Sequence, residues 1–132
     1  MAQTAASFES FDLLFMTVWS LRSAHDALKQ IRGKVRINPH CDERAEEFDT
    51  SLKSDIESLK AHRDTVLAGG LSDHSAFLHT AWKVIAEMND HKRAFKKKDV
   101  QKRAKQEEGL YDMKVSDAVK AMEIVAFSRE EC

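Results

Sequence analysis

Apolar side chains recur at intervals of three and four residues along most of the chain, and this spacing limits the possible folds more than any other feature. It is the period of one face of an α-helix, whereas a half-buried strand would alternate at every second residue. The first such series contains Phe11, Leu14, Val18, Leu21 and Leu28, with His25 filling the gap. The sequence therefore predicts an all-α protein, and its first helix carries a coiled-coil-like seam.

The few helix-breaking residues set the expected boundaries. Four Gly and one Pro among 132 residues are too few for a protein built from many tight turns. Gly33, Gly69-Gly70 and Gly109 are predicted to end helices, while Asn38-Pro39 and Ser116 are predicted to start them. We expect a single domain over residues 1–132, an antiparallel bundle of three long helices and a short C-terminal fourth, at about 7–32, 39–68, 73–108 and 116–129.

The sequence predicts a cytoplasmic protein that does not enter membranes. Its longest apolar run, Leu13 to Met16, is far shorter than the roughly 20 residues that cross a bilayer. No basic residue precedes the first apolar stretch, which is unlike a secretory signal. Cys41 and Cys132 form one pair at most, so free thiols in a reducing compartment are expected.

A basic segment, residues 92–105, is the most conspicuous charge feature. If the second and third helices form a hairpin about Gly69-Gly70, residue i lies roughly opposite residue 139 minus i, because both helices rise equally per residue. The acidic residues at 42–49 would then face residues 97–90. This interpretation assigns the basic segment to internal charge neutralisation, with Glu107 and Glu108 covering part of the remainder.

The alternative is that the basic segment binds an acidic partner or nucleic acid. Several cations on one helix gain affinity for a nucleic acid by releasing its condensed counterions. The candidate contact residues are Lys96, Lys97, Lys98, Lys102, Arg103 and Lys105. No helix-turn-helix, zinc-finger or RNA-recognition signature accompanies them.

Six histidines raise the possibility of a metal or small ligand in the bundle core. The weak candidates for such a site are His62, His79, His91 and Glu87. Their spacing does not provide the inward-facing Glu and Glu-x-x-His set of a bundle metal site, so we expect neither metal nor cofactor. His25 is instead expected to pair with Glu46 or Glu47 at the edge of the core.

The sequence lacks the motifs of a catalytic site and has an excess of apolar surface. Neither a nucleophile elbow nor a glycine-rich phosphate loop is present, so no catalytic residue is assigned. The first helix is apolar over more than half of its circumference, which exceeds what two neighbours can cover. We expect Phe8, Met16 and Trp19, with Met122 of the last helix, to contact a second copy or a helical partner. The predicted function is a non-enzymatic interaction module, such as an adaptor, a chaperone-like protein or a regulatory subunit.

Overall fold

The structure is a computed structural model of the whole chain. It describes the backbone of residues 2–35, 39–70 and 73–130, and the side chains of residues 12–35, 43–70 and 73–127. Five helices occupy these ranges, and the prediction of an all-α protein is confirmed. They are α1 (Ala2–Lys34), α2 (Pro39–Leu67), α3 (Ser75–Arg93), α4 (Lys97–Arg103) and α5 (Lys105–Glu130).

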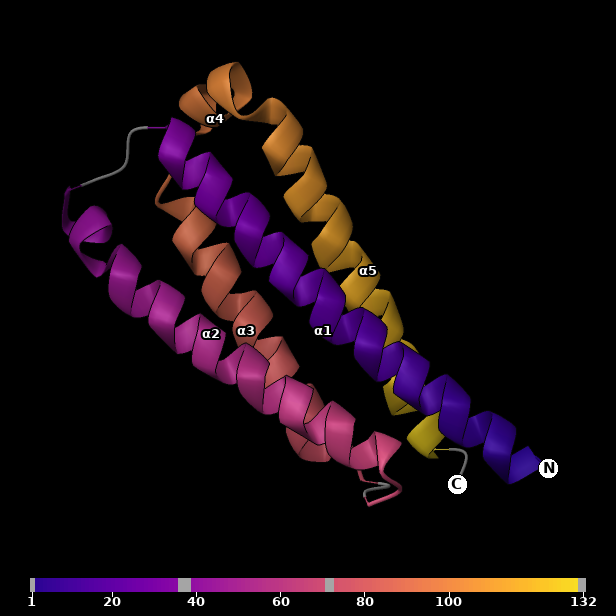
Figure 1. Cartoon of the computed structure of the whole chain (residues 1–132). Coiled ribbons are helices and arrows are strands. Elements are labelled where there is room, and N and C mark those ends of the chain that lie inside the picture. The colour runs from indigo at the N-terminus through magenta and orange to yellow at the C-terminus, as the bar shows by residue number, and fades with distance from the viewer. Residues whose placement is uncertain (1, 36–38, 71–72, 131–132) are drawn as a thin grey trace.

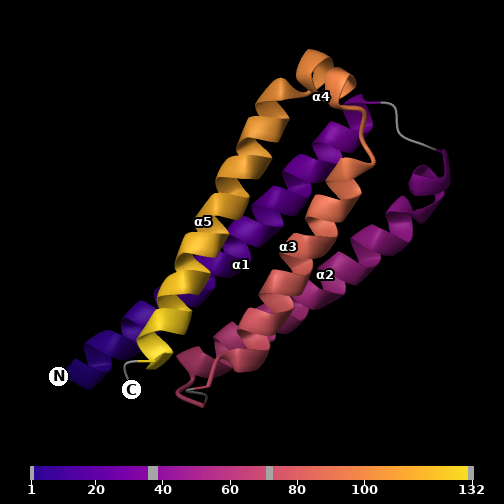
Figure 2. The ribbon, with the colours of Figure 1, turned by 180° about the vertical axis from the view of Figure 1, so that it is seen from behind.

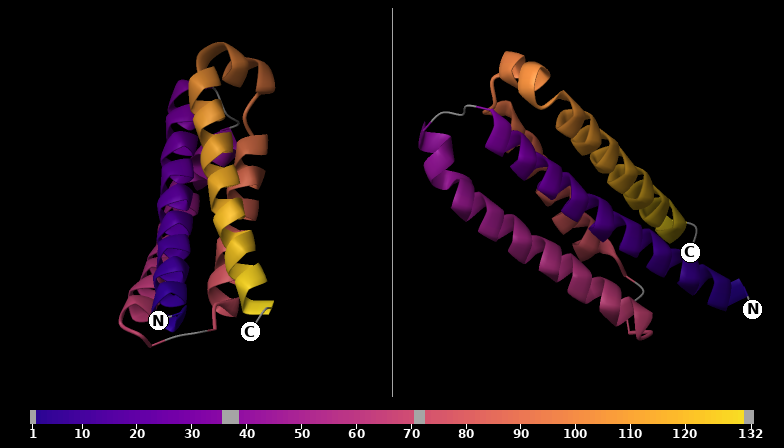
Figure 3. Two further views of the ribbon diagram at one scale, coloured as in Figure 1. Left: turned by 90° about the vertical axis from the view of Figure 1, so that its right-hand side faces the viewer. Right: turned by 45° about the horizontal axis from the view of Figure 1, so that its top comes forward.

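Four of the helices lie side by side, and α4 lies across one end of them (Figure 1). The helix α1 contacts each of the others, with α2 on one flank and α5 on the opposite flank. The view from behind shows α3 closing the fourth side (Figure 2). At the end covered by α4, α1 and α3 end while α2 and α5 begin (Figure 3).

Small side chains bring α1 and α5 together in the most extensive helix contact of the fold. Ala24 and Ala27 of α1 and Ala118 and Ala121 of α5 are all buried. Such residues let two helix backbones approach closely, because no long side chain separates them. Lys34 pairs with Glu107 and the helices run antiparallel, so residue i of α1 lies about level with residue 141 minus i of α5.

The antiparallel packing of α2 against α3 follows the expected register. The Phe48 ring stacks on His91 with centroids 4.1 Å apart. Farther along, Lys83 Nζ lies 3.6 Å from an oxygen of Asp55. Both pairs fit the relation of i to about 139 minus i, so the predicted hairpin register is confirmed for these contacts.

The C-terminal end of α2 is a Schellman motif. The Gly69 amide donates to the Val66 carbonyl and the Gly70 amide to the Thr65 carbonyl, each over 2.9 Å. Gly69 has a φ of +82°, in the left-handed region that glycine adopts without steric cost. The motif satisfies carbonyls that would otherwise lack partners and ends the helix where the sequence predicted.

The predicted third and fourth helices are wrong in length. The chain leaves α3 at Arg93, whereas one helix to residue 108 was expected, and it forms α4 before α5 begins. Phe95, Val100 and Ala104 are buried across this break, so turning the chain over the end of the bundle covers apolar groups. Gly109 lies inside α5, which is therefore long rather than short. Glycine in a helix interior costs only about 1 kcal/mol, less than the packing of α5 against α1 recovers.

Within the part of the chain that the structure describes, no helix is both long enough and apolar enough to cross a membrane.

Candidate interaction surface

Two of the four residues predicted to contact a partner are exposed. Met16 is 50% exposed and Trp19 is 56% exposed, both on the outward side of α1. Met122 is fully buried, so its placement on the surface is a wrong prediction. It packs in the core because α5 turns its Tyr111, Ala118 and Met122 side inward. The side chain of Phe8 lies outside the described residues.

The C-terminal part of α5 adds apolar residues that the sequence analysis missed. Ile124 is 50% exposed and Phe127 is 62% exposed. Together with Lys120 and Glu123 they line a shallow pocket of about 470 Å³ on the outside of the helix. Both residues fall off the apolar stripe of α5. Large apolar residues off the stripe of an amphipathic helix are the signal that would have identified them.

These residues lie at one end of the α1 and α5 pair. In the antiparallel register, residues 14–19 of α1 are about level with residues 122–127 of α5. We define the α1/α5 apolar surface as Met16, Trp19, Ile124 and Phe127. The neighbouring Phe15 is also exposed, and the guanidinium of Arg63 from α2 lies 5.2 Å from the centre of its ring.

The basic residues predicted to contact an acidic partner occupy the opposite end of the bundle (Figure 3). All are exposed, and none makes an ion pair with a described side chain. They are Lys96, Lys97, Lys98, Lys102, Arg103 and Lys105. Their grouping follows from the turns at either end of α4, which fold a stretch of ten residues onto one end of the molecule.

Charge neutralisation of the basic segment differs from the prediction. Glu46 and Glu47 of α2 are exposed, and no ion pair joins residues 43–49 to residues 92–105 among the described side chains. Lys92 instead pairs with Glu108 and Asp112 of α5, each over 3.3 Å. Although α2 begins at the end covered by α4, the chain turns at Ala94 and packs α4 against α1 and α5, so α4 does not contact α2.

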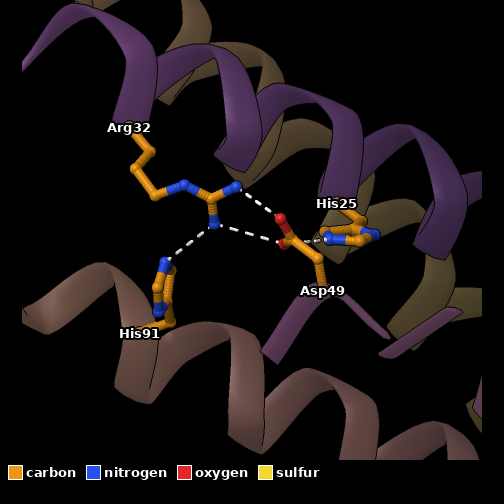
Figure 4. Close-up of polar contacts among 4 residues, drawn as sticks. All are labelled: His25, Arg32, Asp49 and His91. Carbon is orange, nitrogen blue, oxygen red and sulfur yellow. Dashed lines mark hydrogen bonds and ion pairs between the residues drawn. The ribbon is translucent and has the colours of Figure 1, made fainter. Parts of the chain in front are cut away.

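A polar cluster of His25, Arg32, Asp49 and His91 joins α1, α2 and α3 (Figure 4). His25 Nε2 donates to Asp49 Oδ1 over 2.9 Å, and Arg32 donates to the two carboxylate oxygens over 3.2 and 2.5 Å. Arg32 also donates to Nε2 of His91 over 3.2 Å. The predicted partners of His25, Glu46 and Glu47, are therefore replaced by Asp49.

The charges of this cluster determine its protonation. Burial acts to raise the pKa of Asp49, but hydrogen bonds from Arg32 and His25 outweigh it and hold that pKa below 3.8. Burial lowers the pKa of His91, and the nearby Arg32 charge lowers it further. Neutral His91 therefore accepts from the guanidinium. All four side chains are used in holding three helices together, so the cluster acts as an interhelical clamp.

The weak metal candidates are distributed over several places. His62 Nε2 lies 3.0 Å from Nδ1 of His74, and His79 is exposed. Glu87 lies 3.9 Å from Lys83, and His91 belongs to the polar cluster. Among the described residues, no three His, Cys, Asp or Glu side chains converge on one point where a metal ion could be held.

Comparison of the chain with protein-family models, with curated proteins and with solved structures finds no match. The six exposed cations at 96–98, 102, 103 and 105 form the cationic end of the molecule. It lies at the opposite end of the bundle from the α1/α5 apolar surface.

Proposed function

We propose that this protein is a non-enzymatic interaction module that associates with a second copy of itself through the α1/α5 apolar surface. The observation that carries the proposal is the exposure of Met16, Trp19, Ile124 and Phe127 at one end of two adjacent helices. Single exposed apolar residues are common on monomers, whereas a group contributed by neighbouring elements is typical of an interface.

The energy available from covering this surface supports association. Fully burying one large apolar side chain is favourable by about 1.5–3 kcal/mol, so half-exposed residues contribute roughly half as much each. A two-fold dimer uses every residue of the surface twice. In addition, the start of α1 extends beyond the end of α5, and none of the described helices lies beside it there (Figure 1). A second subunit would supply one.

A matched pair of lysine substitutions tests the proposal. Phe127 is 62% exposed within the surface, and Leu67 at the end of α2 is 61% exposed outside it. We expect Phe127→Lys to shift the chain from dimer to monomer in size-exclusion chromatography with light scattering, because a charge is costly to bury in an interface. Leu67→Lys should leave the mass unchanged. Equal effects of the two substitutions, or a monomeric parent protein, would refute the proposal.

The cationic end supports a second candidate function, binding of nucleic acid. Its specific basis is six exposed cations within ten residues, none of them paired with a described acid. Binding of this kind weakens steeply with salt because counterions are released. The protein should retain mixed-sequence RNA or DNA, and this retention should fall with added salt. The double substitution Lys102→Gln and Arg103→Gln should reduce it further. No retention at low salt would exclude this function.

A further inference from the structure

A cavity of about 440 Å³ lies between α3, α4 and α5, on the cationic end of the molecule. Its walls come from the last turns of α3, the turn into α4, α4 itself, and the first turn of α5. The lining residues are Asn89, Lys92, Arg93, Phe95, Lys97, Val100 and Glu108. Pockets that take small organic ligands commonly have volumes of about 300–1,000 Å³, so the cavity has a suitable size.

The floor of the cavity is apolar and its amide is held in one orientation. Phe95 and Val100 are buried and present carbon atoms to the cavity. The Tyr111 hydroxyl donates to Asn89 Oδ1 over 2.7 Å. Burial raises the pKa of Tyr111, so this hydroxyl keeps its proton. Because Oδ1 of Asn89 is engaged, the NH₂ group of the same side chain remains to donate to a ligand.

The three cationic side chains that line the cavity differ in how strongly they already pair with carboxylates. Lys92 is held by Glu108 and Asp112, so it neutralises the one carboxylate that lines the cavity. Arg93 makes one exposed pair with Asp90, a kind of contact that contributes little and is readily exchanged. Lys97 makes no ion pair with a described side chain. Arg93 and Lys97 are therefore available to an anion.

We propose that this cavity binds a phosphate monoester whose phosphate is attached to a flat apolar group. Arg93 and Lys97 contact the phosphate, since guanidinium and ammonium groups form strong charge-assisted bonds to phosphate oxygens. The flat group lies on Phe95 and Val100, and the Asn89 amide donates to the ligand. The site is independent of the proposed dimer surface, which lies at the other end of the bundle.

The site can be tested by titrating labelled protein with phenyl phosphate. The side-chain amide signals of Asn89 in NMR spectra report on binding. We expect saturable shifts of these signals. Inorganic phosphate lacks the apolar group and phenol lacks the charge, so each should bind at least about tenfold more weakly than phenyl phosphate. An absence of saturable shifts with phenyl phosphate would overturn the proposal.

Adjacent lysines provide the matched control. Lys97 lines the cavity, whereas its neighbour Lys98 is exposed outside it. Lys97→Gln should weaken phenyl phosphate binding about tenfold and Lys98→Gln less than twofold, because only the first removes a direct charged contact. Equal weakening by both would show that the net charge of this end attracts the anion without a specific site, which also overturns the proposal.

A free phosphate monoester and a nucleic acid share the phosphate chemistry, and separate titrations distinguish them. Phenyl phosphate should bind with little dependence on salt, since few charges are involved. An oligonucleotide that binds with a steep salt dependence and leaves the Asn89 amide signals unmoved would use the outer cations of α4 instead. If the oligonucleotide binds in that way and phenyl phosphate does not bind, the proposal fails.

Discussion

The two antiparallel helix pairs of this protein are held together by different chemistry. Besides the apolar core that they share with the other helices, α2 and α3 are joined by the stacked rings of Phe48 and His91 and by the ion pair of Asp55 with Lys83. His62 of α2 also contacts His74, which directly precedes α3. Along α1 and α5 several alanines of both helices are buried, and the ion pair of Lys34 and Glu107 lies at one end.

This difference has a consequence for the surface. Polar pairs fix the register of α2 against α3 but contribute little net free energy, because each group gives up contacts with water. Alanines leave room for close approach, so the larger apolar residues of α1 and α5 are either in the central core or on the outside. The second group, Met16, Trp19, Ile124 and Phe127, forms the α1/α5 apolar surface.

Removing the carboxylate of the polar cluster should have the largest effect on stability. Asp49→Ala leaves the largely buried Arg32 and His25 without their acceptor, and we expect a loss of about 3 kcal/mol in the free energy of unfolding. Asp64→Ala removes a carboxylate whose pair with Arg63 is exposed, and should cost less than about 1 kcal/mol. Urea unfolding followed by circular dichroism measures both. Equal losses would show that the cluster does not clamp the helices.

Enlarging an alanine between α1 and α5 should have the next largest effect. Ala121 is buried and about level with the buried Ser20, so Ala121→Leu is expected to destabilise the protein by about 2 kcal/mol through overpacking. Ala86→Leu, at an exposed position of α3, should change stability by less than about 0.5 kcal/mol. An unchanged free energy of unfolding in Ala121→Leu would contradict the close approach of these helices.

Two glycines should respond to alanine with opposite signs. Gly69→Ala places a Cβ at a φ of +82° and is expected to cost about 1 kcal/mol. Gly109→Ala meets no atom within 4 Å and should stabilise the protein by about 0.5–1 kcal/mol, because alanine favours the helix interior. Thermal unfolding of both variants gives the signs. A destabilising Gly109→Ala would contradict an uninterrupted α5.

Mild acid should produce the smallest effect, and it should act on the α2 and α3 pair. Burial lowers the pKa of His62 and His91 in the folded chain below the ordinary value of 6.5. The unfolded chain therefore takes up protons first, so stability is full above about pH 6.5 and falls as the pH drops below it. The lowered pKa of Asp49 adds a second loss below pH 3.8.

Hydrogen exchange measured as a function of pH would show which helices lose stability in mild acid. Amides of α2 and α3 should lose protection before those of α1 and α5. His91→Gln should flatten the pH dependence, while the same change at the exposed His79 should not. Uniform loss of protection in all four long helices would mean that these histidines do not distinguish the two pairs.

Much of the α2 and α3 pair was predictable from the sequence because its boundaries and contacts depend on residues with strong preferences. Gly69 ends α2 as expected, and the register relation anticipates Phe48 against His91. The identity of the His25 partner was not predictable, since several carboxylates occupy the first turns of α2. Only the rotation of that helix decides that Asp49 faces α1 while Glu46 and Glu47 face solvent.

The α1 and α5 pair was harder to predict. Gly109 suggested a helix end, but its cost is small beside the packing of residues 111–125 against α1. Conversely, no glycine or proline marks the helix breaks at Ala94 and Ala104. The chain turns there because the turn buries Phe95 and Val100 over the end of the bundle. The surface was only half identified, because Ile124 and Phe127 come level with Met16 only through the antiparallel packing of α5 against α1.

The most direct test of the proposed association at the α1/α5 apolar surface is to dilute labelled protein and record its backbone amide chemical shifts by NMR. We predict that the shifts change with concentration at residues 12–20 and 120–127, while those of α2 and α4 stay unchanged. Spectra independent of concentration, or shifts clustered at the cationic end, would contradict it.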